Sequence, residues 1–456
     1  MNRSLQMGDS SIPRLLLKFS LPAIVGLLVN ALYNIIDSIF VGRGVGALGL
    51  AGVTVNFPVV TTFIACVMLI GMGATSLISI RLGQGKEEEA ENIIGNALIL
   101  FLVVGFLVTV LGLIFLEPIV IFFGASQELL PYAAGYLSII LIGSIPMAIG
   151  TGMNNFIRAE GNPKTAMYTM LIGTVTNIVL DYVFIFIFHW GIKGAAAATI
   201  ISYCVTSTWV LYYFLSGKSM LKIRRVNLKL KKILVQSILV IGFPTFILQV
   251  ASSVQQLILN RSLAYYGGDL ALAVIGIIMS ITTFLVMPAM GITQGAQPII
   301  GYNYGAQKYD RVKSTLKLEI LAATAILALG WTVSKLWPTQ LIGLFNKNPQ
   351  LIEMGTHGMR IFFFLIPLVG MQMISSGYFQ AVGKPNQATI LGLSRQIFIF
   401  IPLLIILPRI WGLEGVWLSA PFSDLGAFIL TGIWLMVEFK NLNRESTTYR
   451  EAKCDW

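Results

Sequence analysis

Residues 93–116 read IIGNALILFLVVGFLVTVLGLIFL and contain no charged side chain. A stretch of about 20 mostly apolar residues is long enough to cross the hydrocarbon core of a bilayer as an α-helix. The whole chain shares this character, because 56% of its 456 residues are hydrophobic, 11% are charged, and the mean hydropathy is +0.81. A soluble domain carries roughly a quarter charged residues. We therefore expect an all-α integral membrane protein.

Apolar segments of this kind recur along the chain, separated by short polar gaps. Proline and glycine interrupt several of them, which membrane helices tolerate because neighbouring groups satisfy the freed backbone. The first segment is too long for the apolar region of a cleaved signal peptide, so it is expected to remain as a helix. Twelve transmembrane helices are expected at residues 15–40, 53–82, 93–116, 129–157, 165–188, 194–215, 233–263, 272–300, 316–336, 356–380, 387–407 and 415–437.

Lysine and arginine fall unequally on the two sides of these spans. Cytoplasmic loops of membrane proteins carry an excess of basic residues. If the N-terminus is inside, the outer segments hold few of them: Arg43, Lys193, Arg261, Lys335, Lys347, Arg360 and Arg409. Apart from Arg395, which lies within a span, the others are all on the inner side. We expect a multi-pass protein of the bacterial inner (plasma) membrane with both termini in the cytoplasm.

The most basic gap is residues 216–232, which contain seven lysine and arginine residues. Such a segment could bind anionic lipid headgroups, although a positive-inside linker between two halves is the preferred interpretation. The net charge of +11 does not indicate nucleic-acid binding, since the basic residues sit in short gaps and not on a folded polar surface. Three cysteines indicate no disulfide framework.

The sequence partly matches itself at an offset of 222 residues. Two clusters of identities share this offset, and both lie at the inner ends of corresponding helices, which indicates duplication. The matched pairs are Pro22 and Pro244, Gly73 and Gly295, Ala74 and Ala296, Gly83 and Gly305, Lys86 and Lys308, Ala159 and Ala381, Gly161 and Gly383, Pro163 and Pro385, and Ala166 and Ala388. Trp190-Gly191 matches Trp411-Gly412 one residue out of register.

Each half contains six spans, so both halves enter the membrane from the same side. The two six-helix repeats are therefore parallel, with a pseudo-twofold axis along the membrane normal. Transporters built in this way place their binding site at the repeat interface and rock one half against the other. We expect an N-lobe (residues 1–215), a basic cytoplasmic linker (216–232), a C-lobe (233–440) and a cytoplasmic tail (441–456).

Charged side chains within a span are rare and costly, and each is a candidate functional residue. Asp37 lies near the outer end of the first helix, and Asp181 lies about two turns before the outer end of the fifth. Asn177 is one turn from Asp181 on the same face, and Thr199 lies at a similar depth in the sixth helix. These four oxygen-bearing side chains are expected to cluster in the outer half of the N-lobe.

Such a cluster suits a proton or a small hard cation. Two nearby carboxyl groups in a low-dielectric site do not both ionise easily, and they titrate together. We therefore expect Asp37, Asn177, Asp181 and Thr199 to form a cation-coupling site, which would hold a metal ion only if Na⁺ is the coupling ion. The alternative is that they are hydrogen-bonded structural groups near helix ends. No cofactor is expected.

The C-lobe lacks this set. At the 222 offset, Leu259, Ile399 and Leu403 occupy the positions of Asp37, Asn177 and Asp181. Its own intramembrane charges are Arg395 and Asp424, which could pair with each other or face a central cavity. Motifs of metalloproteases and serine hydrolases are missing from the chain, and Gly42, Gly44 and Gly46 fit a tight turn between helices. The chain is not expected to be an enzyme.

The chain resembles the MATE (multidrug and toxic compound extrusion) family over essentially its whole length. The similar segments are NIIDSIFVG with Asp37, RAEGNPKTA after the fourth helix, TNIVLDY with Asn177 and Asp181, and GAAAAT ending at Thr199. Acids found in helices 7 and 10 of members with a C-lobe sodium site are absent, so that second site is in doubt. This absence, together with Arg395 and Asp424, makes the chain more similar to the bacterial multidrug branch that includes MepA-type proteins.

The resemblance implies a secondary active antiporter that exports amphipathic, often cationic organic compounds, including antibiotics, in exchange for H⁺ or Na⁺. It implies a monomer whose partners are these drugs, the coupling ion and membrane lipid. A lipid-linked saccharide flippase of the same superfamily is an alternative, but it would need several cavity arginines for pyrophosphate, and only Arg395 is plainly intramembrane. A non-transporting membrane protein is a third possibility, which the repeat and the buried acids disfavour.

Overall fold

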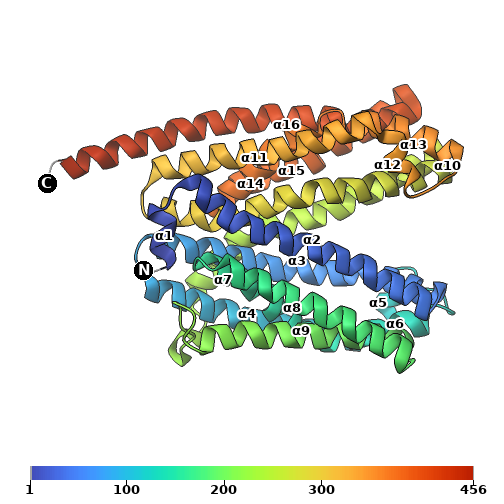
Figure 1. Ribbon diagram of the computed structural model, residues 1–456, viewed down its shortest axis with the longest axis horizontal. Coiled ribbons are helices and arrows are strands. Elements are labelled where there is room, and N and C mark those ends of the chain that lie inside the picture. Colours follow the sequence, from blue (N-terminus) through green and yellow to red (C-terminus); the bar gives the residue numbers. More distant parts are fainter. Residues whose placement is uncertain (1–2, 455–456) are drawn as a thin grey trace. The chain divides into compact units, whose positions relative to one another are not determined.

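The computed structural model describes the backbone of residues 3–454 and the side chains of residues 5–447, so the end of the predicted tail lies outside the described residues. Every element of regular secondary structure in the described chain is a helix (Figure 1). The elements are α1 (Arg3–Asp9), α2 (Ile12–Gly44), α3 (Ala47–Gly83), α4 (Glu87–Ile114), α5 (Leu116–Phe122), α6 (Leu130–Ile142), α7 (Ser144–Ala159), α8 (Pro163–Tyr182), η1 (Val183–Ile187), α9 (Gly191–Leu215), η2 (Arg225–Leu228), α10 (Lys232–Gly305), α11 (Tyr309–Leu336), α12 (Pro338–Gly343), α13 (Pro349–Phe362), α14 (Ile366–Ala381), α15 (Pro385–Leu393), η3 (Ser394–Ile399) and α16 (Phe400–Cys454).

The twelve predicted spans all correspond to helices. Eight described segments are long and apolar enough to cross a membrane, and two bent pairs, α6–α7 and α13–α14, form one more span each. Two of the eight are interrupted by a glycine in a non-helical conformation, Gly268 in α10 and Gly412 in α16. Each interruption falls in a predicted gap between two spans. The predicted all-α, twelve-helix fold is confirmed.

The backbone repeats itself at the offset found in the sequence. Residues with positive φ recur in pairs: Gly46 (89°) and Gly268 (64°), Gly85 (73°) and Gln307 (57°), Gly161 (96°) and Gly383 (76°), and Gly191 (56°) and Gly412 (56°). The bends of the two broken spans are also alike, 58° for α6–α7 and 52° for α13–α14. The two halves therefore share their turns and breaks as well as scattered identities.

Packing divides the chain into two compact units. Of the described residues, unit 1 contains 3–7 and 25–246, and unit 2 contains 8–24 and 247–454. The first part of α2 thus packs with the second half of the chain, while the first part of α10 packs with the first half. Each helix passes from one unit to the other just after a repeated proline, Pro22 in α2 and Pro244 in α10.

Glycines allow these exchanged helix segments to pack closely. In unit 1, a Cβ on Gly242 of α10 would overlap the carbonyl oxygen of Leu69 on α3, and one on Gly73 of α3 would overlap that of Ile238. In unit 2, a Cβ on Gly295 of α10 would overlap the backbone of Ser20 on α2. Gly73 and Gly295 are a repeat pair, so the same helix crossing occurs once in each unit.

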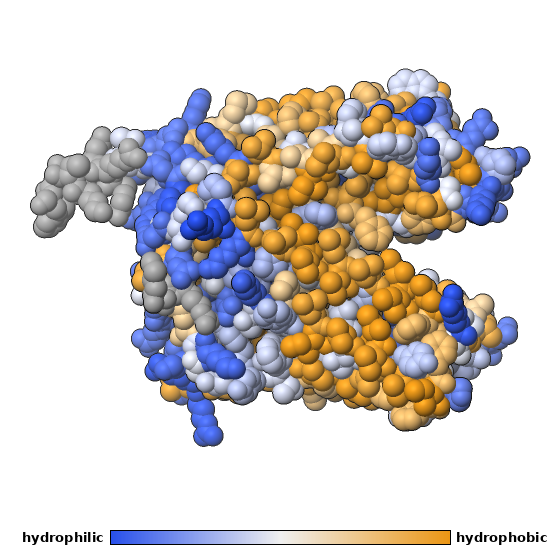
Figure 2. Space-filling view, in the orientation of Figure 1, coloured by the Kyte–Doolittle hydropathy of each residue, from blue (hydrophilic) through white to orange (hydrophobic). Residues whose placement is uncertain are grey.

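The surface of the molecule matches the requirements of a bilayer. Apolar side chains cover the lengths of the helices, and hydrophilic side chains gather toward their ends (Figure 2). Many large hydrophobic residues are exposed on membrane-length helices, among them Phe106 and Ile114 on α4 and Val175 on α8. Exposed apolar area on this scale is stable only in lipid. The protein is a multi-pass membrane protein.

Candidate functional site

The site begins on α8 in unit 1. Asn177 and Asp181 lie one turn apart on the same buried face, with exposed fractions of 1% and 0%. Thr199, on the adjacent helix α9, is 7% exposed, and its side chain contacts that of Asn177. The π-helix η1 begins directly after α8, two residues beyond Asp181. Single-turn π-helices are often found at functional sites because they redirect side chains.

The side-chain amide of Asn177 connects two helices. Oriented so that both of its polar atoms are satisfied, its nitrogen donates to Asp181 Oδ2 at 2.6 Å and its oxygen accepts from the Thr199 backbone N–H at 3.2 Å. Asn177 therefore links Thr199 on α9 to Asp181 on α8.

Asp37 completes the predicted set from α2. Its carboxyl group lies next to that of Asp181. The Oδ1 atoms of Asp37 and Asp181 are buried and have no hydrogen-bond partner in the described part of the chain. The four residues predicted from the sequence are thus brought together, and two carboxyl oxygens remain available to an ion.

Three tyrosines that the sequence analysis missed surround this cluster. Tyr33, one turn before Asp37 on α2, lies close to Thr199 and to Asp37. Tyr136 on α6 lies close to both carboxyl groups and to Tyr203 on α9. The spacing of four residues between Tyr33 and Asp37 was a usable signal, whereas Tyr136 lies on a helix without charged residues.

The cluster can bind a proton or a small hard cation. Carboxyl, amide and hydroxyl oxygens are ligands for hard cations, and the pair of carboxyl groups can share a proton. No group of three or more His, Cys, Asp or Glu side chains that could hold a metal ion occurs among the described residues. A metal at this site would therefore rely on the neutral oxygens of Asn177 and Thr199 as well as the two acids.

Unit 2 contains the other predicted pair. Arg395 Nε donates to Asp424 Oδ1 at 2.6 Å, and the Ser423 hydroxyl donates to the Arg395 carbonyl at 2.7 Å. The Asp424 side chain is 3% exposed and that of Arg395 31%. Arg395 lies in the second π-helix, η3. Arg395 and Asp424 therefore pair with each other, which is one of the two predicted alternatives.

Four buried glutamates were also missed, because the sequence shows neither their burial nor their partners. Glu91 on α4 and Glu160 after α7 bind the segment that follows α9. Glu438 on α16 pairs with Lys384 at 2.7 Å and accepts a hydrogen bond from Tyr378 at 2.8 Å. Glu319 on α11 is 1% exposed, and its Oε2 has no hydrogen-bond partner within the described chain.

Comparison with known families gives a repeated match. The model of the MatE family matches residues 22–183 and, a second time, residues 244–406. The two matched segments begin 222 residues apart, at Pro22 and Pro244. The family match therefore follows the internal repeat found in the sequence and in the backbone.

Similar proteins carry names connected with drug export. The multidrug export protein MepA of Staphylococcus haemolyticus (strain JCSC1435) is 30% identical over 408 residues, 90% of each chain. A solved structure of a protein described as the MATE multidrug transporter DinF-BH is 40% identical, with a TM-score of 0.89 over 95% of this chain and 97% of that one. An outward-facing multidrug resistance MATE family transporter of the MOP superfamily is 26% identical, with a TM-score of 0.91 over 97% and 99%.

Proposed function

The chain belongs to the MatE family, and on that premise we propose that it is a secondary active multidrug efflux antiporter. It exports amphipathic, often cationic organic compounds in exchange for H⁺ or Na⁺. The names of its MepA and MATE relatives support multidrug export. It acts as a monomer in the bacterial inner membrane with both termini in the cytoplasm, and it performs no enzymatic reaction.

The contact between the carboxyl groups of Asp37 and Asp181 carries this proposal. Two neighbouring carboxylates repel each other unless one of them holds a proton or a cation lies between them. The pair therefore binds one positive charge more readily than either acid would alone. A group that takes up an ion from outside and releases it inside is what an antiporter needs.

Asn177 extends this argument to the neighbouring helix. Its amide nitrogen donates to Asp181 Oδ2 and its amide oxygen accepts from the Thr199 backbone N–H. An ion that binds at Asp181 would therefore act on α9 through Asn177.

The remaining steps follow from the repeat. Substrate enters between the N-lobe (1–215) and the C-lobe (233–440), which the linker 216–232 connects, and ion binding at Asp37 and Asp181 repacks α2 and expels it by rocking-type alternating access. A membrane potential of about 100 mV supplies about 2.3 kcal/mol for each charge moved. One ion exchanged for an uncharged substrate thus supports roughly fiftyfold accumulation on the outer side.

A lipid-linked saccharide flippase is the less favoured function. Its pyrophosphate would need several free cavity arginines, whereas Arg395 is paired with Asp424. In the antiporter, that pair is proposed to hold the C-lobe helices together or to line the cavity.

The test is efflux of a fluorescent organic cation from proteoliposomes, with a proton gradient and a sodium gradient imposed separately. Asp37→Asn and Asp181→Asn are compared with Glu117→Gln, which removes an exposed carboxyl group on α5. We expect one gradient to drive efflux, and both Asp variants to lose at least about tenfold of the rate while Glu117→Gln retains it. Normal pumping by Asp37→Asn would show that the coupling site is wrong. Failure of both gradients in folded protein would favour the flippase, and transport of lipid-linked saccharides would then be measured.

A further inference from the structure

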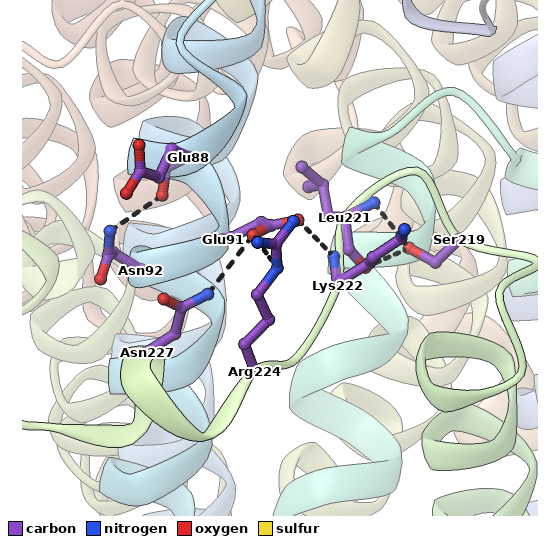
Figure 3. Close-up of polar contacts among 8 residues, drawn as sticks. All are labelled: Glu88, Glu91, Asn92, Ser219, Leu221, Lys222, Arg224 and Asn227. Atoms are coloured by element: carbon purple, nitrogen blue, oxygen red, sulfur yellow. Dashed lines mark hydrogen bonds and ion pairs between the residues drawn. The ribbon is translucent and has the colours of Figure 1, made fainter.

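Residues 216–231, between α9 and α10, form a strap that is fixed to unit 1 by two buried carboxylates, Glu91 and Glu160. Figure 3 shows the contacts of Glu91 with the strap. Glu91 on α4 accepts the Lys222 backbone N–H at 3.0 Å and pairs with Arg224 Nε at 3.2 Å. Glu160 accepts the Ser219 hydroxyl at 2.6 Å and the Met220 backbone N–H at 3.1 Å. Both ends of the first half of the strap are therefore held through charge-assisted hydrogen bonds, which are stronger than neutral ones.

The second half of the strap lies directly on α4. The Lys231 backbone N–H donates to Asn96 Oδ1 at 2.7 Å, and Asn96 Nδ2 donates to the Lys229 carbonyl at 3.3 Å. A Cβ on Gly95 would overlap the carbonyl oxygen of Asn227, so the two backbones touch at this point. The strap is thus attached mostly by its main chain and by Asn227, and many of its side chains are left to point away from the unit.

The outward side chains are basic and apolar. Lys222, Arg225, Lys229 and Lys232 are exposed, and their side chains make no ion pair or hydrogen bond within the described residues. Interleaved with them are three exposed hydrophobic residues: Val226 at 74%, Leu230 at 51% and Ile233, at the start of α10, at 78%. Exposure of three large apolar side chains to water is energetically unfavourable.

The charge around the strap is one-sided. Residues 216–232 contain no acid, and of the neighbouring acids Glu91 and Glu160 are already used to anchor the strap. Glu87 and Glu88 in the first turn of α4 are the exposed carboxylates that remain beside it. Several cations next to inserted apolar side chains are the pattern by which peripheral segments bind an anionic membrane surface.

We infer that the strap is a binding site for anionic phospholipids of the leaflet on the predicted cytoplasmic side. Arg225, Lys229 and Lys232 bind the headgroups, and Val226 and Leu230 insert among the acyl chains beside them. A soluble acidic partner or a nucleic acid would use the cations but would leave the apolar side chains in water. The position of the strap between the ends of two membrane helices, α9 and α10, favours lipid. This inference does not depend on the coupling ion or the drug.

The test places a reporter on the strap. Val226→Trp is reconstituted into vesicles of phosphatidylcholine with phosphatidylglycerol, and the bromine atoms that quench tryptophan are carried on the acyl chains of one lipid or the other. The fluorescence of the parent protein is subtracted, and Leu107→Trp, an exposed apolar position on α4, provides the lipid-facing reference. We expect the fluorescence of the introduced tryptophan to be quenched, and more strongly by brominated phosphatidylglycerol than by brominated phosphatidylcholine.

Charge removal then tests the headgroup contacts. Replacing Arg225, Lys229 and Lys232 by Gln in the Val226→Trp protein should reduce the preference for phosphatidylglycerol by up to about fivefold for each charge at low salt. The matched control replaces Lys193, Lys347 and Arg409, on the predicted outer side, and should leave it unchanged. Two outcomes would overturn the inference: a tryptophan that only aqueous quenchers reach, which would indicate a soluble partner, or equal quenching by both lipids. A cooperative thermal unfolding transition of each variant before reconstitution shows that the protein is folded.

Discussion

At the scale of single residues, Glu319 and Glu438 form an informative contrast. Both are buried glutamates of unit 2, but Glu438 is held by Lys384 and Tyr378, whereas Oε2 of Glu319 has no partner in the described chain. An unsatisfied buried polar atom costs about 1–3 kcal/mol, and breaking a buried ion pair costs about 3–5 kcal/mol. The two side chains should therefore respond in opposite ways to the same substitution.

We predict that Glu319→Met raises the free energy of unfolding by roughly 1 kcal/mol, while Glu438→Met lowers it by about 3 kcal/mol. Thermal unfolding of the purified protein in detergent measures both, and each variant serves as the control for the other. If Glu319→Met were as destabilising as Glu438→Met, Glu319 would have a partner that the packing does not reveal.

The candidate site could be predicted from the sequence only in part, for a reason visible in its residues. Asp37 and Asp181 are unusual because a charge within an apolar span is costly, and Asn177 follows from its helical spacing to Asp181. Tyr136 and Tyr203 are ordinary residues of apolar helices, and nothing in their spacing indicates what they face. The orientation of the Asn177 amide depends on distances between side chains on two helices, which no sequence pattern contains.

At the scale of elements, the turn that follows α3 and the turn that follows α10 are built alike from different residues. Gly85 and Gln307 both have positive φ, and the following Lys86 and Lys308 make equivalent backbone hydrogen bonds, to Arg81 at 2.9 Å and to Asn303 at 2.8 Å. A residue with a Cβ is strained by roughly 1–2 kcal/mol in this conformation. Glycine is not strained there, but it loses more conformational entropy on folding, which costs roughly 0.5–1 kcal/mol.

We therefore predict that Gln307→Gly raises the free energy of unfolding by up to about 1 kcal/mol, and that Gly85→Gln lowers it by a similar amount. Nothing lies within 4 Å of a Cβ built on Gly85, so the backbone conformation is the dominant cost there. The measurement is thermal unfolding of both variants. A loss of stability in Gln307→Gly would mean that the Gln307 side chain makes a contact worth more than the strain.

The loop after α7 is an element whose stability should depend on pH. Burial raises the pKa of Glu160, and the hydrogen bonds from Ser219, Tyr213 and the Met220 backbone only partly oppose this. In the pH range between the ordinary Glu value of about 4.3 and the raised value, the folded chain binds more protons than the unfolded chain. The free energy of unfolding should therefore fall as the pH rises through this range.

We predict that Glu160→Gln removes this part of the pH dependence. The difference in thermal midpoint between the parent and the variant should be most favourable to the parent at low pH and should decrease as the pH rises. Glu117→Gln, at an exposed carboxyl group, should follow the parent at every pH. A parent that gains stability over Glu160→Gln with rising pH would contradict the direction of the shift.

The elements themselves were largely predictable, because an uncharged apolar run of about 20 residues has few alternatives to a membrane helix. The π-helices η1 and η3 were not predictable, since they arise where tertiary packing adds a residue to a turn. The bends after Ile142 and Phe362 were also missed, and each span had been expected as one helix.

At the scale of the whole molecule, the sequence repeat predicted two six-helix halves, but not the exchange of helix segments between the packed units. Residues 8–24, which include the first part of α2, belong to unit 2, and residues 232–246 of α10 belong to unit 1. This exchange depends on which surfaces fit together, and the glycine pair Gly73 and Gly295 was visible in the sequence only as a repeated identity. Two helices, α2 and α10, thus contribute residues to both units.

The close packing of the exchanged helix segments leads us to predict how three glycine substitutions change stability. A Cβ on Gly73 would overlap the Ile238 carbonyl oxygen, and one on Gly295 would overlap the backbone of Ser20, so neither contact can be relieved by moving a flexible side chain. Gly73→Ala and Gly295→Ala should each lower the free energy of unfolding by about 3 kcal/mol or more. Gly276→Ala on α10, with nothing within 4 Å, should be neutral or stabilising by up to about 1 kcal/mol. The measurement is thermal unfolding of the three variants.

Because the crossing occurs once in each unit, Gly73→Ala and Gly295→Ala should lose similar amounts of stability. If Gly73→Ala kept the stability of the parent while Gly295→Ala lost it, the two crossings would not be equivalent.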